Sequence, residues 1–84
     1  MVKILYFARL KETLGMGSEE IPLPEAVSTL GELRAALILR GGDWARVLAA
    51  SSPIRAAVNQ AMASDDTPIK AGDEIAFFPP VTGG

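Results

Sequence analysis

The chain has 84 residues, 10 acidic and 8 basic side chains, a formal net charge of -2, and neither cysteine nor histidine. This length holds one compact domain, and the missing thiols and imidazoles exclude disulfide scaffolds, Cys/His zinc sites, haem ligation and Cys or Ser-His nucleophile pairs. Negative charge disfavours nucleic acid as a partner. The longest apolar run, residues 35–39, is far below the about 20 residues of a membrane span. We therefore expect a cytoplasmic protein that contacts no membrane.

The N-terminal part predicts two strands separated by one helical turn. Residues 2–8 are rich in β-branched and aromatic side chains, and their alternation gives two faces: Val2, Ile4 and Tyr6 on one, Lys3, Leu5 and Phe7 on the other. We expect the helical turn in residues 9–17 to stop at Gly15, where a left-handed backbone caps it. Pro22 and Pro24 remove backbone donors from one side of residues 19–24, which predicts an edge strand.

The clearest helix begins at Thr29, whose hydroxyl can cap the first turn while Glu32 reaches back to the Thr29 amide. Its apolar stripe has helical spacing and consists of Leu30, Leu33, Ala36 and Leu37. We expect this helix to carry Arg40 in its last turn and to end at Gly41 and Gly42.

A second short helix, capped by Asp43, is predicted to place Trp44 in the core or as a lid. Residues 54–59 and 74–78 alternate as two further strands. The acidic pairs at 65–66 and 73–74 are typical turn residues without calcium-loop spacing, so we expect no metal site.

The order strand, strand, helix, strand, strand predicts an α+β fold: a ubiquitin-like β-grasp with a mixed sheet packed on one main helix. Residues 1–78 would form this domain, and residues 79–84 an extended tail that ends in Gly-Gly.

Two aromatic side chains are predicted to lie together where the tail departs. Lys3 marks the solvent face of the first strand and Glu74 that of the last, which places Phe7 and Phe78 on the same faces. If the two strands are parallel neighbours, the rings form an interface. The alternative, that one or both rings fold under a loop, stays open.

The tail reads Pro79-Pro80-Val81-Thr82-Gly83-Gly84. The prolines favour an extended path, and the glycines give the slenderest end that a protein can offer to a narrow tunnel; a frayed terminus is the alternative. Adenylation of the terminal carboxylate would let a sulfur nucleophile form a thioester, persulfide or thiocarboxylate. Because the chain has no thiol and no Gly-rich phosphate loop, catalysis, ATP and the sulfur source would belong to partners.

Residues 77–84, Phe-Phe-Pro-Pro-Val-Thr-Gly-Gly, resemble the small subunits of molybdopterin synthase, a family of β-grasp sulfur carriers. The likeness covers most of the chain. Residues 2–8 resemble the family's opening strand and residues 27–37 its helix. Residues 56–62, with Ala-Val-Asn-Gln at 57–60, resemble its third strand, and residues 72–84 its closing strand and tail. Residues 39–54 match poorly, so no role is carried over to them.

This resemblance implies that the Gly84 carboxylate is adenylated by an ATP-using adenylyltransferase related to ubiquitin-activating enzymes. A sulfurtransferase or cysteine desulfurase would then supply the sulfur of a thiocarboxylate. The tail would enter the catalytic large subunit and deliver sulfur to cyclic pyranopterin monophosphate. The chain would be a non-catalytic subunit without a bound cofactor, and a surface of Phe7, Met62 and Phe78 would contact both the large subunit and the activating enzyme.

Three other functions remain open. The thiazole sulfur carrier of thiamine synthesis shares the fold and chemistry, although the run of aromatic and proline residues argues against it. A ubiquitin-like protein modifier would join its terminus to a lysine, and a plain interaction module would have an inert tail.

Overall fold

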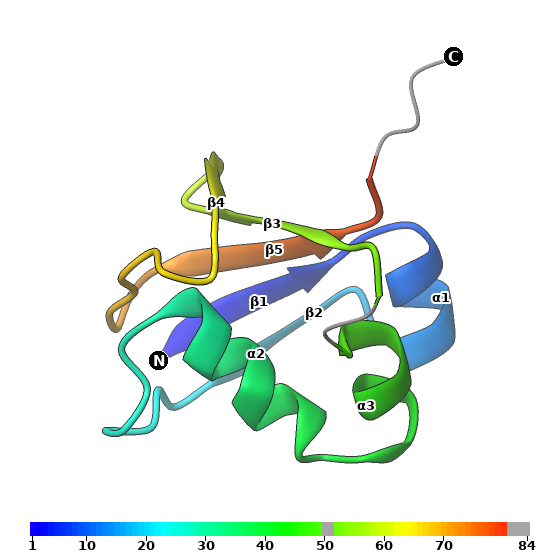
Figure 1. Cartoon of the computed structure of the whole chain (residues 1–84), viewed down its shortest axis with the longest axis horizontal. Coiled ribbons are helices and arrows are strands. Elements are labelled where there is room, and N and C mark those ends of the chain that lie inside the picture. The colour runs from blue at the N-terminus through cyan, green and yellow to red at the C-terminus, as the bar shows by residue number, and fades with distance from the viewer. Residues whose placement is uncertain (50–51, 81–84) are drawn as a thin grey trace.

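Strand β1 (Val2–Tyr6) lies inside the sheet, and the side chains on its core face, Val2, Ile4 and Tyr6, are at most 1% exposed. The computed structural model describes residues 1–49 and 52–80. The sheet order is β2-β1-β5-β3-β4, with β2 (Ser18–Ile21), β3 (Arg55–Val58), β4 (Ala61–Ala63) and β5 (Glu74–Phe78). β1 and β5 are parallel and the other pairs are antiparallel, so the sheet is mixed, as predicted (Figure 1).

Three helices accompany the sheet: α1 (Arg9–Leu14), α2 (Leu30–Ile38) and α3 (Gly42–Leu48). α2 is the main helix, and its leucine stripe is buried against the core face of the sheet, with Leu30, Leu33 and Leu37 at most 2% exposed. This confirms the predicted α+β, ubiquitin-like β-grasp arrangement. No helix in the described residues has both the length and the hydropathy that a membrane crossing requires.

The two ends of α2 differ in how well the sequence predicts them. At the start, the Thr29 hydroxyl accepts from the Glu32 amide at 3.2 Å, and the Glu32 carboxylate accepts from the Thr29 amide at 3.1 Å, as predicted. The predicted end is wrong: α2 stops at Ile38, and Gly41, with φ 75°, is the N-cap of α3. Asp43 is therefore not a cap but lies in the first turn of α3.

Arg40, which follows α2, ties the N-terminal hairpin to α3. Its guanidinium donates to both carboxylate oxygens of Glu19 at 2.8 and 3.0 Å, and it lies 5.1 Å from the ring centre of Trp44. Glu19 also accepts from the Tyr6 hydroxyl at 2.8 Å, and that hydroxyl accepts from the Trp44 indole at 3.2 Å. Trp44 thus packs against the core, as predicted.

These contacts set the ionisation of both acidic groups. Burial, more than any other cause, raises the pKa of Tyr6, so its hydroxyl remains a donor. Partial burial would raise the pKa of the Glu19 carboxyl, but hydrogen bonds from Arg40 and Tyr6 outweigh it and hold that pKa below its usual value.

Two turn predictions near the N-terminus have different outcomes. Gly15 caps α1 with φ 73° and donates to the Lys11 carbonyl at 3.0 Å, as predicted. β2 does lie at the sheet edge. However, it ends at Ile21, so Pro22 and Pro24 follow the strand and do not remove donors within it.

Strand β4 is not predicted by the sequence patterns. Asn59 and Gln60 take positive φ angles of 50° and 70°, and they reverse the chain between β3 and β4. The Asn59 side chain then donates to the Asp73 carboxylate and accepts from the Glu74 amide, both at 3.0 Å. The resemblance suggested one strand over residues 56–62, and this is wrong because the Asn-Gln pair forms a turn.

Candidate functional site

β1 and β5 end at the same edge of the sheet because they are parallel neighbours (Figure 1). Their register closes with Tyr6 opposite Phe77, whose rings stack on the core face with centres 6.3 Å apart. The Phe7 amide donates to the Phe77 carbonyl at 3.1 Å just beyond this pair. The strand ends are therefore fixed from the core side at the point where Pro79 follows β5.

Phe7 and Phe78 come next along these two strands and lie on the face of the sheet away from the helices. Phe7 is 47% exposed and Phe78 is half-buried, so Phe7 does not fold under a loop. Ala8 follows with φ 52° and ψ -128°, a strained backbone for a residue with a Cβ. The chain thus turns immediately after Phe7, the residue that follows β1.

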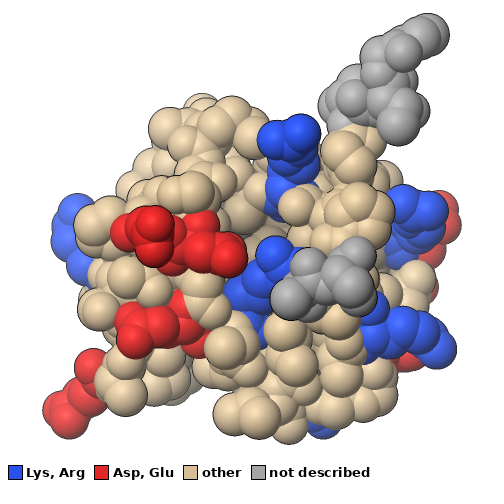
Figure 2. Space-filling model, viewed as in Figure 1, with Lys and Arg blue, Asp and Glu red and all other residues tan. Residues whose placement is uncertain are grey.

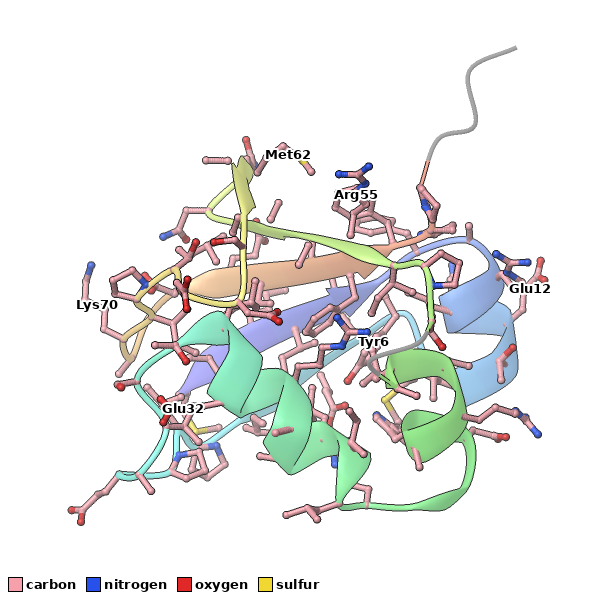
Figure 3. All side chains as sticks on the ribbon, viewed as in Figure 1. Tyr6, Glu12, Glu32, Arg55, Met62 and Lys70 are labelled. Carbon is pink, nitrogen blue, oxygen red and sulfur yellow. The ribbon has the colours of Figure 1, made fainter. Side chains whose placement is uncertain are left out.

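Met62 lies on the same face, two strands away from Phe78. It is 65% exposed and points away from the helices (Figure 3). The registers place one apolar row across four strands, and with the two phenylalanines it forms the outer apolar surface: Leu5, Phe7, Ala57, Met62, Ala76 and Phe78. Phe7, Met62 and Phe78 are the three contact residues expected from the sequence. Leu5 is expected on the same face as Phe7 but not as a contact residue, and Ala57 and Ala76 are not expected in this surface.

Two pockets border the start of the tail and share Pro53 and Ile54. One, of about 390 Å³, is lined by Arg34, Arg55 and Pro80 among others. The other, of about 290 Å³, includes Arg9, Arg46 and Pro79. No sequence pattern links these arginines, since they come from separate elements that only the fold brings together.

The remaining predicted tail residues, Val81, Thr82, Gly83 and Gly84, lie outside the described residues. Pro79 and Pro80 are described and are half-buried. The role of all these residues, and of Phe7, Met62 and Phe78, in partner binding stays a prediction.

Asp73 is the buried carboxylate of the described residues, and its role is structural. It accepts from the Asn59 side chain at 3.0 Å and from the Lys70 amide at 2.9 Å. These bonds, that of Asn59 first, hold the pKa of Asp73 below its usual value. In the described ranges, no three Asp, Glu, His or Cys side chains are grouped to hold a metal ion.

Comparison with known proteins agrees with this architecture. The Escherichia coli (strain K12) molybdopterin synthase sulfur carrier subunit is 40% identical over 84 residues, covering 100% of both chains. A chain of the Helicobacter pylori 26695 complex of subunits 1 and 2 of molybdopterin-converting factor has a TM-score of 0.65 and 27% identity, covering 99% of this chain and 97% of that chain. The structure of H. volcanii small archaeal modifier protein 1 has a TM-score of 0.76 and 27% identity, covering 95% and 97%. Residues 4–84 match the ThiS family. The chain therefore belongs to the ThiS family and is a relative of the molybdopterin synthase sulfur carrier subunits.

Proposed function

We propose that this chain is the sulfur carrier subunit of molybdopterin synthase and acts in molybdenum cofactor biosynthesis in the cytoplasm. The observation that carries the proposal is the outer apolar surface beside the start of a tail that ends in Gly83-Gly84. Clustered exposed apolar side chains mark interaction sites, and a slender end suits a tunnel in the protein bound there. The full-length similarity to the E. coli subunit supports the same assignment.

The working group in this proposal is the Gly84 carboxylate. A carboxylate is a poor electrophile, so it first attacks the α-phosphate of ATP, which forms an acyl-adenylate and releases pyrophosphate. A hydrosulfide equivalent then displaces AMP and leaves a thiocarboxylate. After the sulfur passes to cyclic pyranopterin monophosphate, an oxygen from water restores the carboxylate.

The rest of the chemistry belongs to partners. An adenylyltransferase binds the ATP, and the large subunit holds the pterin. A sulfurtransferase or cysteine desulfurase supplies the sulfur as a persulfide, whose S–S bond a thiol reductant cleaves to give sulfur at the hydrosulfide level. The folded domain presents the tail, whose residues 79–84 can reach at most about 20 Å when extended. The outer apolar surface docks first on the activating enzyme and then on the large subunit, so the two bind in turn.

Intact mass spectrometry tests the proposal directly. The chain is incubated with ATP, sulfide and the adenylyltransferase of the same organism, and we expect a species with sulfur in place of one terminal oxygen. The matched control lacks Gly83 and Gly84; it should melt like the full chain, since the residues that form the described core all precede Phe78, but should gain no sulfur. Unmodified full-length chain after this incubation would refute the proposal.

A protein modifier is the second candidate, and the likeness to small archaeal modifier protein 1 favours it. In that case the activated Gly84 would form an isopeptide bond with a lysine of another protein. Adducts of higher mass that resist denaturation in cell extract would distinguish this function. A thiazole sulfur carrier would also gain sulfur at its terminus, but it would not donate that sulfur to the pterin in the large subunit.

A further inference from the structure

Most arginines of this acidic chain line the pockets at the start of the tail. Four of its five arginines line the two pockets that include Pro79 and Pro80, namely Arg9, Arg34, Arg46 and Arg55. On the face in Figure 2, most Asp and Glu side chains gather at the end away from the finish of β5, and most Lys and Arg side chains lie toward it.

Two of these four arginines serve the fold. The Arg34 side chain donates to the carbonyls of Leu48 and Ala49, both at 2.6 Å, and so satisfies the end of α3. Arg46 pairs with Asp43 within α3. Their positive groups are therefore already engaged.

Arg9 and Arg55 are different, because both are exposed and neither forms an ion pair with any described residue. Arg55 lies opposite Phe78 in the β3–β5 register and points away from the helices (Figure 3). Arg9 begins α1, two residues after Phe7. Arg55 therefore lies on the strand beside Phe78, and Arg9 lines the pocket that includes Pro79, so both arginines lie near the start of the tail.

We propose that Arg9 and Arg55 bind carboxylates at the mouth of the tunnel that receives the tail in the large subunit. This inference rests on the proposed function and adds the chemistry of the partner surface: Asp or Glu side chains around an apolar patch. A guanidinium fork matches a carboxylate in geometry. Apolar contacts supply burial, whereas charges at the rim steer the approach and fix the orientation of the tail.

Association kinetics with the large subunit of the same organism test this inference. The variant is Arg9→Gln/Arg55→Gln in the full chain. The matched control is Lys3→Gln/Lys70→Gln, which removes the same charge from exposed side chains at the other end of the domain. At low ionic strength we expect the arginine variant to associate about tenfold more slowly, with a shallower salt dependence, and the lysine variant to match the unmodified chain.

Unfolding curves of both variants show that the comparison is between folded proteins. The inference is overturned if the arginine variant keeps the original rate and salt dependence, or if the lysine variant slows as much. An unmodified chain that does not bind the large subunit overturns the proposed function together with this inference. An unmodified chain that binds and donates sulfur, beside an unimpaired arginine variant, overturns the arginine inference alone.

Discussion

Phe77 and Phe78 are sequence neighbours on opposite faces of the sheet, so alanine at each position should affect a different property. Phe77 is 0% exposed and stacks on Tyr6, whereas Phe78 is half-buried on the outer apolar surface. We expect Phe77→Ala to reduce stability and Phe78→Ala to reduce partner binding.

The magnitudes follow from burial. Replacing a core Phe with Ala costs about 3–5 kcal/mol, a large share of the about 4–13 kcal/mol available to a domain of this length. At about 4–8 °C per kcal/mol, Phe77→Ala should melt at least about 12 °C lower. Half-burial limits the loss of folding stability for Phe78→Ala to about 1–2 kcal/mol. The loss of a central aromatic contact worth about 2 kcal/mol should, however, weaken binding to the large subunit about 30-fold.

Guanidinium unfolding followed by Trp44 fluorescence gives the stabilities, and calorimetric titration of the large subunit gives the affinities. The titration is performed at a temperature where both variants are folded. Equal destabilisation by the two substitutions would contradict the assignment of faces. Unchanged affinity for Phe78→Ala would show that the outer apolar surface is not the docking site.

Three further predictions concern other parts of the fold. Tyr6→Phe removes one of the donors to Glu19, which keeps its bonds from Arg40, and leaves the Trp44 indole without its acceptor, so denaturant unfolding should show a loss of about 1–3 kcal/mol; an unchanged midpoint would contradict this. The lowered pKa of Asp73 contributes stability that is complete above its unfolded-state pKa and is lost as the pH falls through the folded value. Unfolding of Asp73→Asn should therefore respond less to acid, and an identical acid response would count against this role. Ala8→Gly relieves the backbone strain at φ 52° and should raise the free energy of unfolding by about 1 kcal/mol; a lower free energy of unfolding would show that no strain is stored there.

Local patterns in the sequence predict the elements that depend on neighbours in the chain. Alternation from Val2 to Tyr6 identifies β1, because successive side chains of a strand point to opposite faces whichever strands pair with it. The Thr29 and Glu32 pair identifies the start of α2, because the capping bonds join residues three apart. The prediction of where α2 ends is wrong for the opposite reason. Arg40 suits the last turn of a helix, but its bonds to distant Glu19 lie outside any local pattern.

The candidate site likewise contains some residues that local patterns predict and others that only the fold brings together. Strand parity places Phe7 and Phe78 on the outer face, and parallel pairing brings them together. Met62 entered through the resemblance alone, because β4 follows a turn that requires positive φ at Asn59 and Gln60, neither of which is glycine. Arg55 is a candidate binding residue only because it pairs with Phe78 in the β3–β5 register, and no spacing along the chain predicts that register.

The position of β5 explains how a strand that ends in a tail can remain fixed while the tail engages a partner. β5 pairs with β1 on one side and β3 on the other, with Lys3 to Tyr6 and Arg55 to Val58 as its partners. A load on the tail would therefore pull along two hydrogen-bonded ladders, and many bonds must shear together before the strand moves. An edge strand would have one ladder only. Central placement of the last strand thus separates the behaviour of the tail from the stability of the core, which is what the proposed docking on two partners in turn would require.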